Sequence, residues 1–281
     1  MGDIQYIHIA STAGGPMQSR HDVELVPRSG VLGDRYAARS GYWQDDRVSR
    51  DLTLIEAEAI ASLADLGIEL APGETRRNLT TRGVTLSALI GQLFWIGDII
   101  ARGTGPCNPC EHLVQLTGKP MLRPLVGRAG IRADVLTRGR IRIGDLIEVA
   151  TVQAGVGVLV ARGDEVLIGR RLSAHGYGSW SVPGGRPNPG ESAVSCASRE
   201  LREETGLEAE GHQIVGESID AFPESHTVFQ TTFVRVRAGG GAQPRALEPE
   251  KTARWEWRSW NRLPGPLFRP VQSLAASGYL L

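Results

Sequence analysis

Three glutamates in the second half of the chain have the spacing of a metal site. Glu200, Glu203 and Glu204 lie at positions i, i+3 and i+4, so in a helix they share one face. Gly206 follows directly and is typical of a residue that ends a helix, which places the three charges at the end where the helix dipole disfavours them. Like charges at this spacing cost up to about 1 kcal/mol, so we expect a cation to compensate them. The spacing also fits a solvated acidic helix in which Arg199 pairs with Glu203.

The glutamates belong to a longer pattern that spans residues 184–207. Five residues separate Gly185 from Glu191, and seven separate Glu191 from the run RELREETGL at 199–207. This stretch resembles a complete Nudix box, and a match over so many fixed positions is more specific than a lone glycine-rich motif. Three residues upstream also resemble the family, namely Trp180, Pro183 and Gly184.

The resemblance implies an enzyme that hydrolyses phosphoanhydride bonds with a divalent metal. By that resemblance Glu203 and Glu204 bind Mg²⁺ or Mn²⁺, and Glu200 is a further ligand or the base. Gly184 offers its carbonyl oxygen, and Arg199 orients a carboxylate. Oxygen ligands suit these hard cations better than zinc. The metal neutralises charge on phosphate oxygens, and the base makes water a competent nucleophile.

The segment LEPEKTARWEWRSWNRLPGPLF, residues 247–268, carries a second resemblance to the same family. It is similar to the tail of small MutT-like nucleoside-triphosphate pyrophosphatases, in which a late glutamate adds a metal ligand. The resemblance implies Glu250 as that ligand.

Aromatic residues near this segment allow two interpretations. Trp255 and Trp257 share one face of a predicted strand and Trp260 lies just beyond, so they form either a wall for a nucleobase or part of the core. His175 and Tyr177, just before the glycine loop, either contact substrate or shape a turn, and we leave them out of the predicted site.

Length, charge and cysteine content limit the class of protein. A chain of 281 residues is long enough for two cores, and the 31 basic and 31 acidic residues balance, so no nucleic acid polymer or anionic membrane is expected as a partner. No apolar run is long enough to span a membrane, and the N-terminus lacks a secretion signal. Three cysteines are too few for a disulfide framework, which favours a cytoplasmic protein. The sequence sets no oligomeric state.

Hydrophobic patterns predict two domains of α+β class, residues 1–150 and 151–281. The first is β-rich, with one helix predicted from Leu52 to Gly67. The second is predicted to be an α/β/α sandwich. Its predicted elements are strands at 155–161, 165–171, 228–236 and 253–258 and helices at 191–205 and 270–277.

Four dispersed motifs in the first domain resemble those of a MOSC domain. Their order and spacing cover nearly all of residues 1–150, and the resemblance implies a barrel-like fold. The motifs are GVLGDRY at 30–36, TRRNLTTRG at 75–83, GTGPCNPCEHL at 103–113 and GIRADVLTRGRIRIGDLIEV at 130–149. The turn at Gly33 also predicts a structural pair of Asp34 with Arg35.

Cys107 and Cys110 form a Cys-x-x-Cys motif whose flanking prolines restrain the loop. By the MOSC resemblance a cysteine here binds molybdenum or carries sulfur, with Cys110 as the first choice and Cys107 as an auxiliary. A buried or redox-active pair is the alternative. A structural zinc site is disfavoured because His112 is the only further soft ligand nearby.

A basic stretch between Arg76 and Arg142 predicts an anionic ligand. It holds eleven Lys or Arg and three acidic residues, a local charge of +8. A pterin phosphate of the molybdenum cofactor suits this charge, with Arg76, Arg77 and Asn78 as the residues that match the family. A solvated basic face paired with acids elsewhere is the alternative.

These features lead to one principal functional hypothesis and two alternatives. The principal hypothesis is a Mg²⁺-dependent hydrolase of a nucleoside triphosphate or other nucleoside diphosphate derivative, joined to a MOSC domain that binds molybdenum cofactor or carries sulfur. The MOSC resemblance also implies molybdenum and pyridoxal phosphate binding, although the chain has no pyridoxal-phosphate desulfurase domain to mobilise sulfur. The alternatives are a molybdenum-dependent reductase of N-hydroxylated base analogues with a nucleotide-sanitising Nudix half, and a non-catalytic nucleotide sensor.

Overall fold

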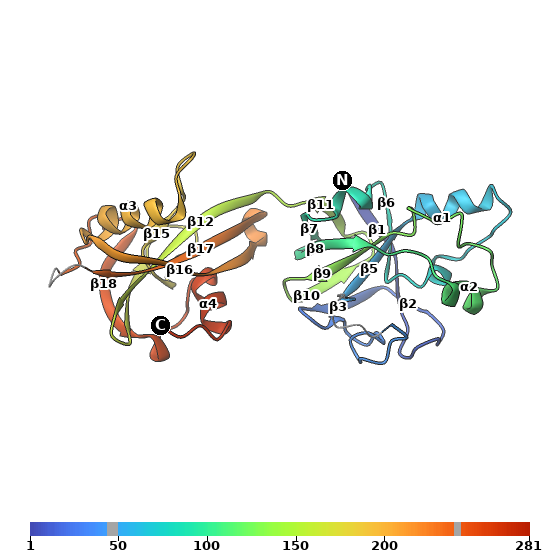
Figure 1. The fold of residues 1–281 in the computed structure, drawn as a ribbon, viewed down its shortest axis with the longest axis horizontal. Helices are drawn as coiled ribbons and strands as arrows, with labels where there is room; N and C mark the ends of the chain where they lie inside the picture. Colours follow the sequence, from blue (N-terminus) through green and yellow to red (C-terminus); the bar gives the residue numbers. More distant parts are fainter. Residues whose placement is uncertain (44–49, 239–242) are drawn as a thin grey trace. The chain divides into compact units, whose positions relative to one another are not determined.

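The computed structural model describes residues 1–43, 50–238 and 243–281. It divides the chain into two compact units, Met1–Thr151 and Val152–Leu281, each with its own hydrophobic core (Figure 1). No helix in the described residues has the length and apolar character needed to cross a membrane.

A closed barrel forms the centre of the first unit. Seven strands follow one another in the order β11-β7-β8-β9-β5-β6-β1, and β1 pairs with β11 to close the circle. The strands are β1 (Gly2–Ile9), β5 (Leu52–Glu56), β6 (Leu79–Arg82), β7 (Leu93–Ile96), β8 (Ile99–Pro106), β9 (Ile131–Val135) and β11 (Leu146–Val149). The barrel-like fold predicted from the MOSC resemblance is confirmed.

Smaller elements surround this barrel. Strand β2 (Gln18–Arg20) extends it beside β1, and β10 (Gly139–Arg142), β3 (Asp22–Val26) and β4 (Gly30–Val31) form a separate sheet. The helical elements are α1 (Ala57–Ala64), α2 (Glu111–Thr117) and the 3-10 turns η1 (Pro72–Thr75) and η2 (Leu86–Leu89).

The helix predicted from Leu52 to Gly67 is wrong over its first five residues. Leu52–Glu56 is strand β5, which pairs with β6 on one side and β9 on the other, and the helix α1 covers only Ala57–Ala64. Leu52, Thr53, Leu54 and Ile55 are all buried. A strand buried on both faces is a continuous apolar run, and periodicity alone does not separate such a run from a buried helix.

A sheet between two helices forms the second unit. Its order is β14-β13-β12-β17-β16, with β15 paired to β12 and β18 paired to β13. The strands are β12 (Val152–Arg162), β13 (Glu165–Arg171), β14 (Trp180–Ser181), β15 (Gly184–Gly185), β16 (Ala209–Phe222), β17 (Thr227–Ala238) and β18 (Thr252–Ser259). The helical elements are α3 (Ala193–Thr205), α4 (Arg269–Ala276) and the 3-10 turns η3 (Pro223–Ser225) and η4 (Trp260–Arg262).

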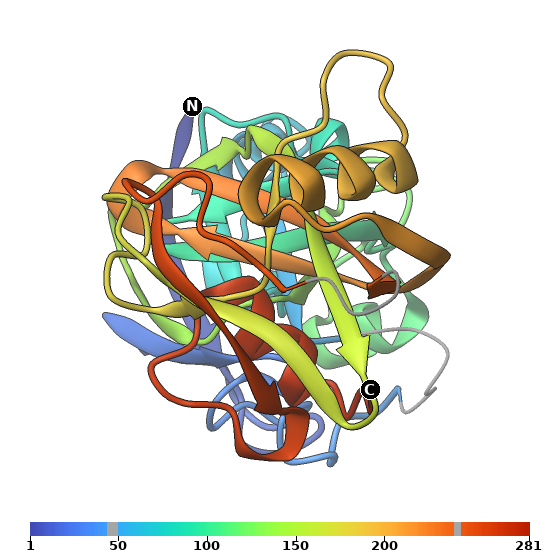
Figure 2. The same cartoon turned by 90° about the vertical axis from the view of Figure 1, so that its left-hand side faces the viewer.

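Alternating residues of the central strands build a core on each face of this sheet. Val158 and Val160 of β12 pack with Leu201 of α3, whereas Leu159 between them packs with Leu274 of α4. Because side chains alternate along a strand, the two helices cover opposite faces (Figure 2). The predicted α/β/α sandwich is confirmed.

Strand β16 was missed in the sequence. Ala209–Phe222 pairs with β17 over its whole length with two register shifts, and most residues of its first half are exposed. An exposed strand that contains Gly211 and Gly216 has few apolar residues to give the alternation by which strands are found.

Candidate functional sites

Helix α3 places the three glutamates beside a strand of two glycines. The side chain of Ser192 caps the helix by accepting a hydrogen bond from the Ser195 N–H, and Gly206, with φ +72°, ends it as predicted. On the inner face Cys196, Ala197 and Leu201 are fully buried in the core, which fixes the rotation of the helix. The carboxylates therefore have a defined direction.

Arg199 links three carboxylates. Its Nε and one Nη donate to both oxygens of Glu191, at 2.9 and 2.8 Å, and its other Nη donates to Glu200 at 2.7 Å and to Glu203 at 3.0 Å. The hydrogen bonds from Arg199 lower the pKa of Glu191 to about 2. The predicted pair of Arg199 with Glu203 is therefore part of a larger network that also orders the loop before the helix.

Glu204 is the most deeply buried of the three glutamates. Its side chain accepts a hydrogen bond of 3.0 Å from the Gly184 N–H, and only 9% of the residue is exposed. Burial raises the pKa of Glu204 to about 8, and burial also raises the pKa of Glu200. At neutral pH the Glu204 carboxyl group therefore keeps its proton in the metal-free protein.

Glycine is required where the strand meets the helix. A Cβ on Gly185 would lie 2.2 Å from the Glu200 Oε1, and a Cβ on Gly184 would lie 2.1 Å from the Val156 carbonyl oxygen. A side chain at Gly185 would collide with the Glu200 carboxylate, and a side chain at Gly184 would collide with the backbone of β12. The two glycines therefore allow β15 to lie close to the Glu200 carboxylate on one side and to β12 on the other.

The donor set fits a hard cation such as Mg²⁺ or Mn²⁺. Oxygen atoms are the ligands that these cations prefer. Glu204 accepts a hydrogen bond from the Gly184 N–H, whereas Glu200 and Glu203 are both hydrogen-bonded to Arg199. Within the described ranges, no group of three His, Cys, Asp or Glu side chains has the ready-made geometry of a metal site. Arg199 is the physical reason, because it holds Glu200 and Glu203 in its own hydrogen bonds.

Glu248, which the sequence analysis did not single out, lies near the carboxylates of α3. Its charge contributes to the raised pKa of Glu204, and its carboxylate pairs with Lys251 at 2.8 Å. The backbone N–H of Leu247 donates to the Glu204 carbonyl oxygen at 3.1 Å, which ties this segment to the helix. Glu250, the predicted ligand, is exposed, and no hydrogen bond or ion pair joins it to the cluster in the described part of the chain.

The tryptophans belong to the core. Trp255 and Trp257 pack against the α3 side of the sheet, and the indole N–H of Trp255 donates to the Glu204 carbonyl oxygen at 3.2 Å. Trp260 is buried on the α4 side and donates to the Tyr279 carbonyl oxygen at 2.9 Å. Of the two interpretations left open by the sequence, the core interpretation holds.

A cavity of about 330 Å³ opens beside the glycine strand. Gly184 and Gly185 line it on the side of the carboxylates, and Phe229, Phe268 and His175 line it elsewhere. His175 was left out of the predicted site, whereas Tyr177 is 72% exposed and does not line the cavity. No local pattern identifies these aromatic residues, because they come from three separate segments.

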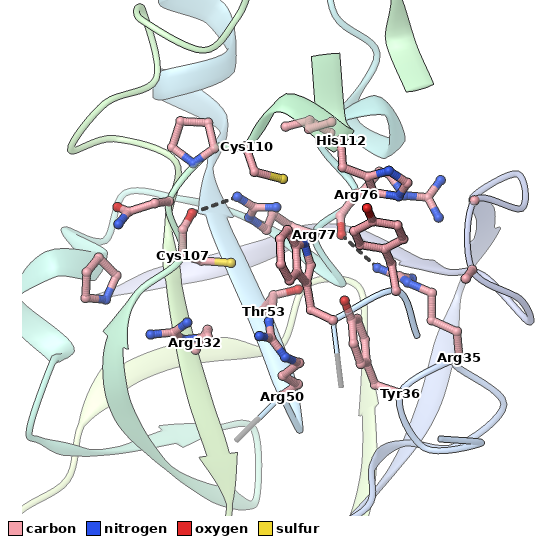
Figure 3. Close-up of a pocket in the computed structure, with 18 residues that line it drawn as sticks. Arg35, Tyr36, Arg50, Thr53, Arg76, Arg77, Cys107, Cys110, His112 and Arg132 are labelled. Atoms are coloured by element: carbon pink, nitrogen blue, oxygen red, sulfur yellow. Dashed lines mark hydrogen bonds between the residues drawn. The ribbon is translucent and has the colours of Figure 1, made fainter. Parts of the chain in front are cut away.

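The first unit contains a cavity of about 300 Å³ that holds both cysteines and five arginines. Figure 3 shows the arginines gathered around the two thiols. Its lining residues come from the loop after β8, from the segment before β6 and from the residues between β1 and β5. The five arginines are Arg35, Arg50, Arg76, Arg77 and Arg132. The basic stretch predicted from the sequence thus supplies three of the five.

The charged side chains of this cavity are incompletely paired. Arg35 forms the predicted buried ion pair with Asp34, at 3.0 Å. Arg50, Arg76 and Arg132 each keep a buried guanidinium nitrogen without a hydrogen-bond partner among the described residues. Burial and the neighbouring charge of Arg35 lower the pKa of Arg76. Unpaired buried cations favour an anionic ligand.

The predicted ligands of this domain have different structural roles. Arg77 donates to the carbonyl oxygens of Cys107 at 2.7 Å and Ala129 at 3.0 Å, so it holds the cysteine loop in place. Asn78 lies outside the cavity lining and is buried, where it hydrogen-bonds to Thr53. The Asn78 contacts indicate a structural role rather than the ligand contact that was predicted.

Cys107 and Cys110 are both free and half-buried at the cavity wall. His112, the other soft ligand considered, stacks on Tyr42 with ring centroids 3.8 Å apart. No ready-made metal cluster includes these side chains in the described residues. The geometry fits a thiol presented to a bound anion better than a structural zinc site.

Comparison with known families places one domain in each unit. Residues 39–148 match the model of the MOSC domain, and residues 151–275 match that of the NUDIX domain. The chain carries a MOSC domain followed by a NUDIX domain. The NUDIX match contains the carboxylate helix and the glycine strand, and the MOSC match contains both cysteines.

Curated relatives and solved structures resemble parts of this MOSC–NUDIX chain. "NAD-capped RNA hydrolase NudC" of Pseudomonas putida strain GB-1 is 34% identical over 120 residues, which cover 43% of this chain and 41% of that protein. The protein of the same name from Stutzerimonas stutzeri is 38% identical over 98 residues, covering 35% and 34%. The chain thus spans about two fifths or less of the length of these relatives.

Two solved structures align with part of the chain at low identity. A MutT NUDIX hydrolase from Burkholderia pseudomallei is 22% identical, with a TM-score of 0.41 and coverage of 44% of this chain and 98% of that one. The YUAD protein from Bacillus subtilis is 20% identical, with a TM-score of 0.45 and coverage of 53% and 96%.

Proposed function

We propose that the NUDIX domain hydrolyses a phosphoanhydride bond of a nucleoside triphosphate or another nucleoside diphosphate derivative, with Mg²⁺ or Mn²⁺. One observation carries the proposal: Glu204 and Glu200 of α3 lie against Gly184 and Gly185, two glycines that also line a ligand-sized cavity. The name of the curated relatives adds NAD-capped RNA to the candidate substrates.

The residues of the cluster have distinct proposed roles. Glu203 and Glu204 hold the cation, with Glu200 as a further ligand or as the base that takes a proton from water. The bound cation neutralises charge on the phosphate oxygens and lowers the pKa of water. Arg199 is a positioning residue, because its hydrogen bonds orient Glu200 and Glu203. Glu248 is the proposed late carboxylate of the tail, ahead of Glu250.

A hydrolysis screen of the full chain tests this proposal. The panel includes canonical, oxidised and N-hydroxylated nucleoside triphosphates, NAD⁺, NADH, an NAD-capped RNA and a pterin dinucleotide. We expect Mg²⁺-dependent turnover of at least one compound, and we expect Glu203→Ala and Glu204→Ala to abolish it. Glu208→Ala is the matched control, because Glu208 is an exposed glutamate just beyond the helix. Turnover that is equal in all three variants would refute the assignment.

A second candidate function, in the MOSC domain, is binding of molybdenum cofactor or transfer of sulfur on a cysteine. The observation that favours it is the cavity in which two thiols lie among arginines with unpartnered buried nitrogens. Arg76 and Arg132 would hold the anionic part of the cofactor, Cys110 would present its thiolate to the metal, and Cys107 would assist. The bound group supplies the redox or sulfur chemistry.

Metal analysis of the full chain, expressed in cofactor-replete cells, tests this second candidate. We expect molybdenum to copurify with the wild type and to be lost from Cys110→Ala, while Cys196→Ala, which changes a buried cysteine of the other domain, retains it. Absence of molybdenum from the wild type would count against the candidate.

If an N-hydroxylated nucleotide is both reduced and hydrolysed, the two domains act on one substrate pool.

A further inference from the structure

The cavity of the MOSC domain places two thiols in a strongly cationic setting. Five arginines line it, and none of the described residues that line it is acidic. Asp34, which does not line the cavity, compensates one of these charges through its ion pair with Arg35. A cavity with this excess of positive charge favours a small dianion over a neutral ligand or a cation.

The guanidinium group of Arg132 lies beside the segment that carries Cys107. Arg132 of β9 pairs with Gly105 of β8, and a Cβ on that glycine would lie 3.4 Å from an Nη atom of Arg132. Cys107 follows two residues later, and in Figure 3 it lies between Cys110 above and Arg132 below. The buried Nε of Arg132 has no hydrogen-bond partner among the described residues. This arginine is therefore suited to bind an anion next to Cys107.

The backbone around Cys107 is fixed and offers few hydrogen-bond donors. The Cys107 N–H donates to the Gly130 carbonyl oxygen at 2.8 Å, and the two prolines of the motif have no N–H. Arg77 donates from each of its three nitrogens to a carbonyl oxygen, one of them that of Cys107 at 2.7 Å. The oxygens of a bound anion are thus left to the other guanidinium groups of the cavity, above all Arg76 and Arg132, which keep unpartnered nitrogens in the described part of the chain.

The two thiols differ in their surroundings. Cys110 packs against an apolar cluster, and Cys107 is not among the residues of that cluster. The cluster includes Leu63, Leu113 and Met121. A thiolate nucleophile is favoured by positive charge and disfavoured by apolar neighbours. The surroundings therefore favour Cys107 over Cys110 as the nucleophile of the cavity.

A nucleophilic sulfur next to an oxyanion site suits a substrate that carries both an oxyanion group and an electrophilic sulfur. Thiosulfate combines the two in one small dianion, with a sulfonate end for guanidinium groups and a terminal sulfur for the thiolate. The cavity volume of about 300 Å³ is ample for such an ion. Sulfite, the leaving group, carries its charge on the oxygens that the arginines already hold, so the same contacts stabilise its departure.

We infer that the MOSC domain takes the terminal sulfur of thiosulfate onto Cys107, with Arg76 and Arg132 on the sulfonate oxygens. The Cys107 thiolate attacks this sulfur, the S–S bond of thiosulfate breaks, and its electron pair leaves with sulfite. The new S–S bond makes Cys107 a persulfide, and the step consumes no oxidant or reductant. The inference rests on the sulfur-transfer form of the second candidate function, and it names the donor of the sulfur.

A single turnover of the reduced full chain with thiosulfate tests the inference. We expect sulfite to be released in an amount equal to the protein, and intact mass to rise by about 32 Da, with peptide mapping placing the added sulfur on Cys107. Cys107→Ser should abolish both signals. Cys196→Ala is the control and should retain both, because Cys196 is a buried cysteine of the other domain. A mass gain confined to Cys110, or no sulfite at millimolar thiosulfate, would overturn the inference.

A variant of Arg132 tests the contact with the sulfonate group. Arg132→Gln should slow the loading of Cys107 about tenfold or more. Arg138→Gln is the matched control, because Arg138 is exposed, pairs with Glu24 at 2.6 Å and does not line the cavity. Equal rates in the two variants would overturn the inference. Should Arg132→Gln fail to fold by its melting temperature, competition by sulfate replaces it: sulfate should slow the loading of the wild type, and an unchanged rate would overturn the inference.

A low-molecular-weight persulfide, used as a second sulfur donor, separates this inference from the second candidate function. Loading of a cysteine from the persulfide but not from thiosulfate supports sulfur transfer by the MOSC domain and overturns the inference. Loading of Cys107 from thiosulfate, in a protein that copurifies with no molybdenum, supports the inference and counts against cofactor binding.

Discussion

The buried carboxylate of Glu204 makes the stability of the metal-free protein depend on pH. Burial raises the pKa of Glu204 to about 8 from an ordinary value of 4.5, so between these values the folded chain retains a proton that the unfolded chain has released. The free energy of unfolding therefore falls as pH rises through this window. Glu200, whose pKa is also raised, acts in the same direction, and Glu191, whose pKa is lowered to about 2, titrates outside it.

The size of the effect follows from the shift. One pKa unit corresponds to about 1.4 kcal/mol, so the full interval for Glu204 amounts to at most about 5 kcal/mol of destabilisation at pH 8. A cation bound at the cluster stabilises the ionised form and removes the penalty. We therefore expect Mg²⁺ to stabilise the protein strongly at pH 8 and little at pH 5.

Urea unfolding of the full chain from pH 5 to 8.5, with EDTA or with Mg²⁺, measures this dependence. Tryptophan fluorescence reports on the NUDIX domain, which holds four of the six tryptophans, and Trp255 donates directly to the Glu204 carbonyl oxygen. Glu204→Gln should flatten the EDTA profile and reduce the gain from Mg²⁺, whereas Glu208→Gln should leave both unchanged. Wild-type stability that stays level or rises from pH 5 to 8 in EDTA would refute the reasoning.

Three further substitutions test individual parts of the structure. Arg199→Met leaves Glu191 and Glu200 without their main partner and should lower the free energy of unfolding by about 2 kcal/mol. The exposed control Arg162→Met should lower it by less than about 1 kcal/mol. Equal losses in the two variants would contradict the stabilising role of the Arg199 network. Gly206→Ala places a Cβ at φ +72°, which should lower the free energy of unfolding by about 1 kcal/mol and with it the melting temperature. An unchanged melting temperature would refute the expected backbone strain. Arg76→Gly relieves the backbone strain of a residue at φ +58°, so the free energy of unfolding in urea should change by less than about 1 kcal/mol. Calorimetry should show weaker phosphate binding in this variant. Unaltered phosphate binding would exclude Arg76 as an anion ligand.

The sequence predicted those parts of the site that lie within one local element. Glu200, Glu203 and Glu204 share a helix that ends at Gly206, and all of them lie within a few residues of one another. Helical periodicity fixes the relative directions of residues so close in sequence. Likewise, the apolar runs of β12 and β13 predicted strands close to those observed, since each run is bounded by turn residues.

What the sequence did not give depends on contacts between distant segments. His175, Phe229 and Phe268 meet only because the loop before β14, strand β17 and the start of α4 surround one cavity. The choice of Glu248 over Glu250 depends on how the tail crosses α3, which spacing does not determine. The strand at Leu52–Glu56 depends on having β6 and β9 as neighbours on both sides, and local propensity yields to such tertiary pairing.

The initial rate of hydrolysis as a function of Mg²⁺ concentration tests the central claim most directly. It is measured on the best substrate of the panel, for the wild type and for Glu203→Gln, which removes one proposed ligand oxygen while keeping the shape of an exposed side chain. We expect a rate that is zero in EDTA and saturates with Mg²⁺, and a loss of at least about 100-fold in Glu203→Gln. Turnover in EDTA, or a Glu203→Gln curve that coincides with the wild type, would contradict it.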